Sequence, residues 1–129
     1  MYKALDLKRM IHRSRNVVFF TGAGISTESG IPDFRSPGGI WTKMAPIQFQ
    51  DFLNSEDMRK ESWRRKFETD KTLRTAKPNE GHYAIERLIS SGKASVVITQ
   101  NIDNLHQDSG IPEEKAVSYT HLTLPTRCL

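Results

Sequence analysis

The chain has 129 residues, a formal net charge of +4, 36% hydrophobic and 26% charged residues. This length suits one domain with a modest core, and no apolar run reaches the length of a membrane span. Charges interrupt the first ten residues, so no signal peptide is predicted. The single cysteine, Cys128, excludes an internal disulfide and a cysteine-clustered zinc site within this chain. We therefore expect a cytoplasmic protein without membrane contact.

The predicted elements alternate between helices and strands. Helical patterns cover residues 3–14, 46–54, 56–75 and the segment from Pro78 to Gly92. The last of these helices is expected to bury a stripe made of Tyr83, Ala84, Leu88 and Ile89. The apolar runs 16–20 and 95–99 are typical of strands that are covered on both faces of a parallel sheet. Strands separated by helices predict an α/β domain in which these two strands are adjacent and parallel.

A glycine-rich segment follows the first strand directly and opens a long predicted loop over residues 21–45. Gly22, Ala23 and Gly24 allow the backbone to approach a pyrophosphate without a side chain in the way. The next glycine, Gly30, comes too late for the usual dinucleotide fingerprint, and a nucleoside-triphosphate P-loop is absent. A plain tight turn remains an alternative interpretation of this segment.

The same loop continues with an unusual group of side chains. Pro32 restricts the backbone, and a carboxylate, a ring and a guanidinium follow in Asp33, Phe34 and Arg35. Arg35 suits phosphate or ribose oxygens. The alternative is that Phe34 and Trp41 merely cover the core.

Polar side chains also follow the second strand, in the segment "QNIDNLH". Gln100, Asn101 and Asp103 offer amide and carboxylate groups to ribose hydroxyls or a carboxamide. Ligands of parallel sheets bind at this end of the strands. The alternative role of Asp103 is to cap the helix that follows. His106 is expected to pack or cap locally, and His12 and His82 to be surface residues or helix-packing partners.

Three segments together resemble the sirtuins, the NAD-dependent protein-lysine deacylases. They are "TGAGISTESGIPDFRSPGGIW", "KPNEGHYAI" and "TQNIDNLHQDSG", and the similarity runs from about residue 5 to about residue 116. The resemblance implies an α/β fold with a Rossmann-like parallel sheet and flanking helices. This chain would hold the N-terminal half of the large domain, without the zinc domain. The implied reaction removes an acyl group from lysine and releases nicotinamide and an O-acyl-ADP-ribose.

The resemblance also implies a set of NAD-binding residues. They are Gly22, Ala23, Gly24, Ser26, Thr27, Pro32, Asp33, Phe34, Arg35, Gln100, Asn101, Ile102 and Asp103. Ala23 and Gly24 would line the diphosphate, with Ser26 and Thr27 nearby. Phe34 would shield the ribose carbon from water, and Arg35 would order the loop around the phosphates.

In the segment after the second strand, Gln100 and Asn101 would serve the nicotinamide ribose and its surroundings, and Asn101 would also support catalysis. Ile102, by its backbone, and Asp103, by its carboxylate, would hold the carboxamide. The protein partner would be an acetylated or otherwise acylated lysine substrate. Because residues 46–77 lack tyrosine, deacetylation is favoured over removal of acidic acyl groups.

The pattern of the family stops near Ala116. Residues 1–116 are therefore predicted to be the N-terminal part of the catalytic domain. The tail 117–129 resembles one frame of a transposon-derived sequencing adapter and is expected to pack on nothing. His121 falls near the place of the sirtuin base but lacks the following glycine, so it is only a positional look-alike. No metal ligands are expected here, although the full-length family member binds zinc, and this chain is expected to be inactive.

Two other hypotheses remain open. One hypothesis is that the chain is a non-catalytic NAD or ADP-ribose binding module. The other is that residues 58–77 bind nucleic acid. Residues 58–77 include eight basic and three acidic residues, but such a run is usually the solvated face of a helix.

Overall fold

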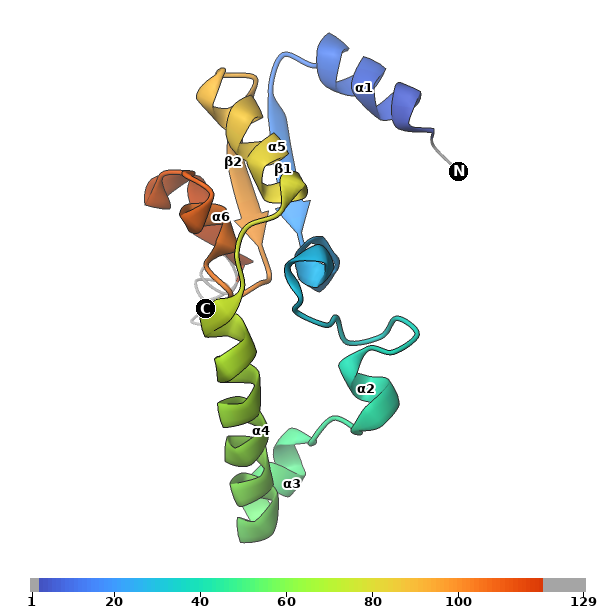
Figure 1. Ribbon diagram of the computed structural model, residues 1–129, viewed down its shortest axis with the longest axis vertical. Coiled ribbons are helices and arrows are strands. Elements are labelled where there is room, and N and C mark those ends of the chain that lie inside the picture. The colour runs from blue at the N-terminus through green and yellow to red at the C-terminus, as the bar shows by residue number, and fades with distance from the viewer. Residues whose placement is uncertain (1–2, 120–129) are drawn as a thin grey trace, which may run out of the picture.

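A parallel sheet forms the centre of the protein. The computed structural model describes residues 3–119, and three strands pair in the order β1-β2-β3. They are β1 Val17–Thr21, β2 Ala94–Thr99 and β3 Ala116–Ser118. Both strand pairs are parallel. Figure 1 shows β1 and β2 in the upper half of the molecule, with α5 Glu80–Ser90 lying across them.

The predicted pairing of the two apolar runs is confirmed. β1 and β2 are adjacent and parallel, with Phe19 opposite Val97 and Thr21 opposite Thr99. Each strand begins or ends one residue away from the predicted bounds. In this register both strands end at the same edge, so the two polar loops begin next to each other.

The remaining helices are mostly where the patterns predict them. They are α1 Ala4–Arg13, α3 Phe49–Asn54, α4 Glu56–Thr75 and α6 Leu105–Asp108, with a short 3-10 helix, η2, at Glu113–Lys115. The prediction of a continuous loop over 21–45 is wrong in detail. This segment contains the 3-10 helix η1 Ala23–Ser29 and the one-turn helix α2 Ile40–Lys43. Gly30 ends η1 in the left-handed conformation, at φ 85°, which glycine adopts readily.

The core lies between α5 and one face of the sheet. Ile85 and Ile89 of α5 pack with Val97 of β2, and Val97 is fully buried. The predicted stripe is wrong at Tyr83, which is 37% exposed, whereas His82 is fully buried. Residues 82, 85 and 89 follow helical spacing on one face, and Tyr83 falls beside that face.

The opposite face of β1 is open. Val18 and Phe20 are 51% and 58% exposed, so the expectation of a strand covered on both faces is wrong. Burial alternates along β1 because the helices of residues 3–119 that pack on the core lie on one side of the sheet. An apolar run predicts two apolar faces, but not that both are covered.

The first residues of the predicted tail do pack on the sheet. Val117 pairs with Ile98, and Ser118 pairs with Thr99. The ring of Tyr119 lies edge-on to Phe20, with 5.4 Å between centroids. The expectation that the tail packs on nothing is therefore wrong for residues 117–119, because they continue the backbone pairing of β2. His121 and Cys128 lie outside the described residues.

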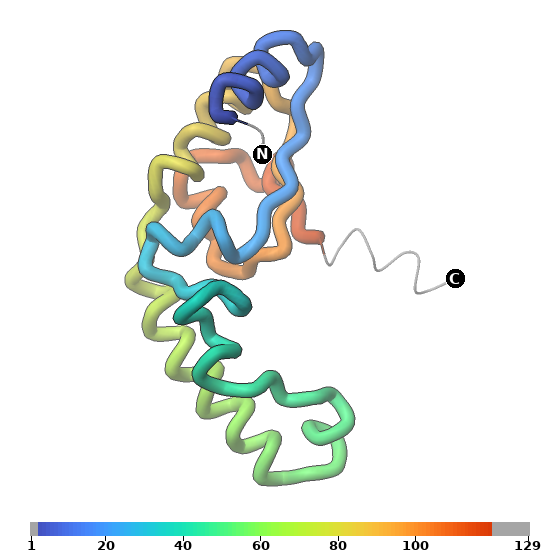
Figure 2. The backbone as a smooth tube through the Cα atoms, turned by 90° about the vertical axis from the view of Figure 1, so that its right-hand side faces the viewer, coloured from blue at the N-terminus to red at the C-terminus, as the bar shows by residue number. Residues whose placement is uncertain are grey.

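Helices α3 and α4 extend away from the sheet, at the end opposite to α1 (Figures 1 and 2). The Ser55 side chain caps α4 by accepting from the N–H of Met58 at 3.3 Å. Among residues 3–119, no helix has the length and apolar character needed to cross a bilayer.

The basic run of α4 is largely neutralised within the helix itself. Four cations pair with carboxylates one turn away, in the pairs Lys60–Glu56, Arg64–Glu61, Arg65–Glu61 and Arg74–Asp70. The Arg64 and Arg65 side chains bond Glu61 and lower the pKa of its carboxyl group to about 2. These pairs account for four of the eight basic residues of 58–77 and argue against a continuous patch of unpaired cations.

Candidate functional site

The loops after β1 and β2 are joined where the two strands end. The Gln100 N–H donates to the Thr21 carbonyl at 3.0 Å and carries the strand pairing one step into the loop. The Asn101 side-chain amide donates to the Gly22 carbonyl at 3.0 Å and to Ser26 Oγ at 3.3 Å. The amide predicted to face a ligand is thus engaged with the glycine-rich loop, which it holds in place.

A second link joins Ser26 to Asp103. Ser26 is 1% exposed, and its hydroxyl donates to Asp103 Oδ2 at 2.5 Å. The other carboxylate oxygen accepts from the Leu105 N–H at 3.0 Å, at the start of α6. Asp103 therefore both supports the start of α6 and faces the first loop, so the two interpretations of its role are compatible.

Gly22 and Gly24 have no structural reason to be glycine within the protein. A Cβ added at either position would meet no atom within 4 Å, and neither φ is in the left-handed region. The space beside them is open. An open backbone cradle at the carboxyl end of a parallel strand fits a pyrophosphate, which approaches main-chain N–H groups closely.

The following loop folds back on itself and presents an aromatic pair. The Phe34 and Trp41 rings lie 5.4 Å apart, and the Arg35 guanidinium lies 4.6 Å from the centre of the Trp41 ring. The backbone N–H of Trp41 donates to the Phe34 carbonyl at 2.9 Å and holds Trp41 against this loop. Phe34 is 47% exposed, so it packs on Trp41 and does not cover the core.

A cavity of about 320 Å³ collects most of the predicted residues. It is lined by Ala23, Ser26, Pro32, Phe34, Gln100, Asn101, Ile102 and Asp103. Five predicted residues are not among its lining residues, namely Gly22, Gly24, Thr27, Asp33 and Arg35. Of these, Thr27 bonds the Gly24 carbonyl, and Asp33 accepts from the Ser36 hydroxyl within its own loop. They shape the loop and do not line the cavity.

Helix α4 supplies a wall of the cavity that the sequence analysis assigned to solvent. Its lining residues are Ser62, Arg65, Lys66, Thr69 and Leu73. Their spacing of three and four residues places them on one helix face. Ser62, Thr69 and Leu73 are uncharged residues on one face of an otherwise charged helix. This pattern was the sequence signal for a helix face that is not fully solvated.

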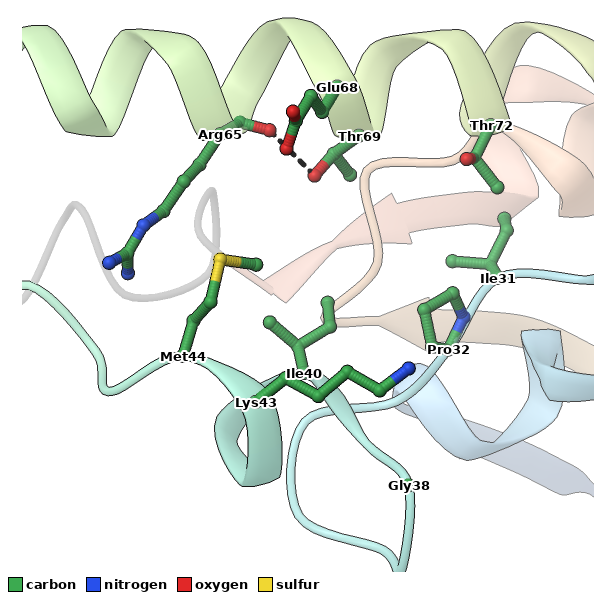
Figure 3. A pocket seen from close by; sticks show the side chains of 10 residues that line it. All are labelled: Ile31, Pro32, Gly38, Ile40, Lys43, Met44, Arg65, Glu68, Thr69 and Thr72. Carbon is green, nitrogen blue, oxygen red and sulfur yellow. Dashed lines mark hydrogen bonds between the residues drawn. The ribbon is translucent and has the colours of Figure 1, made fainter.

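A second cavity, of about 220 Å³, adjoins the first (Figure 3). Ile40 and Met44, at α2, point toward α4, while Ile31 lies opposite Thr72. Ile31, Pro32, Ile40, Arg65 and Thr69 line both cavities. The apolar wall behind Phe34 therefore continues between α2 and α4.

Two buried histidines lie beneath the loops. His82 and His106 are 0% and 1% exposed, and their ring centroids are 5.0 Å apart. Burial lowers the pKa of both, that of His106 to about 4, and the Asp103 carboxylate opposes this only in part. Both rings are therefore neutral at pH 7. Neither lines the cavity.

No group of three or more His, Cys, Asp or Glu side chains within residues 3–119 is arranged to hold a metal ion.

A parallel α/β sheet with two hydrogen-bonded loops and a cavity at its carboxyl edge is the arrangement of a partial Rossmann-like domain, a class in which ligands bind at that edge. The family model described as "Sir2 family" matches residues 22–128. The chain therefore belongs to the Sir2 family, and the predicted resemblance is confirmed.

Named relatives agree with this assignment. The chain is 52% identical, over 93% of its length, to "NAD-dependent protein deacetylase 1" of Bradyrhizobium diazoefficiens, and covers 47% of that protein. It is 51% identical, over 96% of its length, to "NAD-dependent protein deacetylase" of Rhodopseudomonas palustris, and covers 49% of it. The chain thus spans about half the length of these relatives.

Solved Sir2 structures share the fold. One, with a deacetylated p53 peptide and 3'-O-acetyl ADP ribose, matches with a TM-score of 0.78 and 38% identity, covering 91% of this chain and 46% of that one. Another, with a p53 peptide and NAD+, matches with a TM-score of 0.73 and 36% identity, covering 91% of this chain and 45% of that one. The expected Rossmann-like α/β class is thereby confirmed.

Proposed function

We propose that this chain supplies the N-terminal part of the NAD site of an NAD-dependent protein-lysine deacetylase. The observation that carries the proposal is the joint between the two loops, meaning the hydrogen bonds that connect them. Asn101 bonds Gly22, and Ser26 bonds Asp103, beside the cavity. The names of the relatives and the NAD+ complex of a related structure support NAD as the ligand.

Each part of the site has a proposed task. The open backbone at Ala23 and Gly24 would receive the diphosphate. Phe34, on the cavity wall, would keep water from the ribose carbon. Asp103, with one oxygen already bonded by Ser26, would hold the nicotinamide carboxamide beside the Ile102 backbone. NAD, when bound, would supply the ADP-ribosyl group that accepts the acyl group from lysine, with nicotinamide as the leaving group.

The chain as written is proposed to be inactive. Catalysis requires a base within about 2.6–3.2 Å of the proton that it removes, or one water away. His82 and His106 do not line the cavity, and His121 lies outside the described residues. We propose that 117–129 is a non-native tail, and that the parent protein continues into a zinc domain and the rest of the sheet.

Ligand binding tests this proposal directly. ADP-ribose is titrated into the full chain by calorimetry, and the variants Ser26→Ala and Asp103→Asn are compared with Ser90→Ala. Ser90 lies at the end of α5 and bonds only Glu86. Loss of the joint is expected to weaken binding about tenfold, which corresponds to about 1.4 kcal/mol. Equal affinities for all four proteins would contradict the proposal.

A non-catalytic NAD or ADP-ribose binding module remains the second candidate. It is favoured by one observation: the joined loops and the cavity are formed by residues 22–103. Sequencing the parent locus beyond Ala116 separates the two candidates. A stop codon there supports the module, and an open frame that continues into a histidine-glycine segment supports the deacetylase.

A further inference from the structure

The buried pair of His82 and His106 is not used by the proposed chemistry. The rings meet edge to face, with 64° between their planes. They are also the sites of the two buried side-chain polar atoms without a hydrogen-bond partner in residues 3–119, His82 Nε2 and His106 Nδ1. Buried polar atoms are rarely left unpaired, so this pair requires an explanation.

The tautomer of His82 follows from its neighbour at the start of α5. The Asn79 N–H donates to His82 Nδ1 at 3.1 Å. A nitrogen that accepts a hydrogen bond carries no proton, so neutral His82 holds its proton on Nε2. His82 Nε2 is therefore a buried donor.

The tautomer of His106 follows from this assignment. His106 Nε2 lies 2.8 Å from Thr21 Oγ1, and a hydroxyl either donates or accepts. If His106 Nδ1 carried the proton, both unpartnered nitrogens of the ring pair would be buried donors. With the proton on His106 Nε2, Nδ1 is an acceptor in the ring adjacent to the His82 donor, and Thr21 Oγ1 accepts from Nε2.

We propose that Asn79, His82, His106 and Thr21 form one hydrogen-bonded relay through the core, which positions the loop 100–106 that carries Asp103. In it, each group donates to the next: Asn79 N–H to His82, His82 to His106, and His106 to Thr21. The structure shows no hydrogen bond between His82 Nε2 and His106 Nδ1, so this step of the relay closes only by a small shift of the rings or through one bridging water.

Thr21 explains why such a relay positions the loop. Its carbonyl accepts from the Gln100 N–H at 3.0 Å, and its hydroxyl meets His106 at 2.8 Å. The loop 100–106 is thus held on one residue at both ends. At the other end of the relay, the Asn79 side chain donates to the Ile25 carbonyl at 2.7 Å and so ties η1 to α5. Both cofactor loops are fixed to the same buried line of groups.

The charged surroundings of the relay are simple. Asp103 is the charged group that acts on both rings, and each ring acts on the other only when one of them is protonated. A proton added to either ring would create a second donor where an acceptor is needed. His82 and His106 are therefore positioning residues that act only in the neutral state. The link to catalysis rests on the proposed function, whereas the relay itself does not.

Nitrogen NMR of the full chain, labelled at histidine, tests the tautomers without any ligand. At pH 7, His82 and His106 are both expected to show a protonated Nε2 and an unprotonated Nδ1. Their signals are assigned by comparison with His82→Gln and His106→Gln. A proton on Nδ1 of His106, or a charged ring at pH 7, would overturn the proposal.

Hydrogen exchange then tests whether the relay holds the loop. The Leu105 amide, which bonds Asp103, reports on the loop, and amides within α5 report on the fold. Thr21→Val removes the acceptor at nearly constant shape and is expected to speed exchange at Leu105 about tenfold, corresponding to about 1.4 kcal/mol, with α5 unchanged. Thr42→Val, which removes a hydroxyl bonded to the Gly39 carbonyl at 2.6 Å, is the matched control.

The outcomes are distinguishable. His106→Leu removes the donor to Thr21 and is expected to speed exchange at Leu105. His106→Gln keeps an amide donor near Thr21 and is expected to exchange slowly there. Unchanged exchange in Thr21→Val would overturn the positioning role. If Thr21→Val does not fold, the tautomers of the unmodified chain decide. Correct tautomers without ADP-ribose binding would support the relay and contradict the proposed function.

Discussion

The Ser26 hydroxyl donates to the Asp103 carboxylate at 2.5 Å, across 77 positions of sequence. Ser26 lies in the 3-10 helix after β1, and Asp103 lies in the loop after β2. The bond is short because it is charge-assisted and shielded, with Ser26 only 1% exposed. It makes the two loops one structural unit, so a change in either loop is expected to affect the other.

The Ser26–Asp103 bond predicts energetic coupling in a double-mutant cycle. Ser26→Ala and Asp103→Asn each remove the charge-assisted bond, so the second change costs less once the first is made. We expect a coupling of about 1–2 kcal/mol in the free energy of unfolding, measured with urea. Ser90→Ala combined with Asp103→Asn is the control. If the effects of Ser26→Ala and Asp103→Asn simply add, the bond does not contribute to stability.

Burial of His106 predicts acid sensitivity of the fold. Its pKa falls from 6.5 to about 4 because burial disfavours the charged ring. The unfolded chain takes up this proton below pH 6.5, and the folded chain takes it up only near pH 4. The free energy of unfolding is therefore full above pH 6.5 and falls by about 3 kcal/mol as the pH drops to 4.

Urea unfolding at pH 7, 5.5 and 4.5 measures this loss. The lowered pKa of His82 acts in the same direction. His106→Gln is expected to flatten the dependence, whereas the exposed His12 of α1, replaced in His12→Gln, leaves it in place. A stability that does not change between pH 7 and 4.5 would show that the ring is not held neutral.

Two glycines of the loop region are predicted to respond in opposite ways. A Cβ at Gly39 would lie 2.8 Å from Asp33 Oδ1 and 2.9 Å from the Phe34 carbonyl carbon, so Gly39→Ala forces the backbone apart. We expect a loss of about 1–3 kcal/mol in stability. Gly24→Ala meets no protein atom and should change stability by less than about 0.5 kcal/mol.

The same two variants separate folding from binding. Gly24→Ala places a methyl group where the diphosphate is proposed to lie, so ADP-ribose affinity should fall although thermal unfolding does not change. Full affinity in Gly24→Ala would argue against a diphosphate at this position.

Trp41 is predicted to report on the loop. Phe34 and Arg35 pack on its ring at 5.4 Å and 4.6 Å, so ligand contact with either residue should change Trp41 fluorescence. Trp63→Phe leaves Trp41 as the single tryptophan, because the chain has two. A saturable change on addition of ADP-ribose is expected in Trp63→Phe, and a smaller one in Trp41→Phe. The reverse order would show that the loop does not contact the ligand.

The chain as written is predicted to be unable to deacetylate a peptide. Nicotinamide release from NAD is measured in the presence of an acetyl-lysine peptide, with a full-length relative as the positive control. We expect no release above background because, among residues 3–119, no histidine lines the cavity to serve as the base. Release that disappears in His121→Ala would show instead that the tail is native and supplies the base.

The sequence alone determined the two strands and their parallel pairing, and it predicted the place of the candidate site. Apolar, β-favouring runs such as 16–20 form strands through their own local preference, and the Gly- and Pro-rich segment from Gly22 ends the strand. Because parallel strands end at one edge, the neighbourhood of Gly22 and Asn101 followed from the order of the elements. These inferences depend on contacts close in sequence or on a general rule of topology.

The tertiary structure decided what lies against each surface. The sequence predicts that His106 packs or caps locally, but its buried ring meets a partner in Thr21, 85 positions away. The many charged residues of α4 predict a solvent-exposed helix, but the helix face that includes Thr69 lines the cavity. The open face of β1 at Phe20 was likewise not visible, since an apolar side chain shows a preference for burial and not which element covers it. Burial depends on groups that folding brings together from distant positions, and no local pattern contains them.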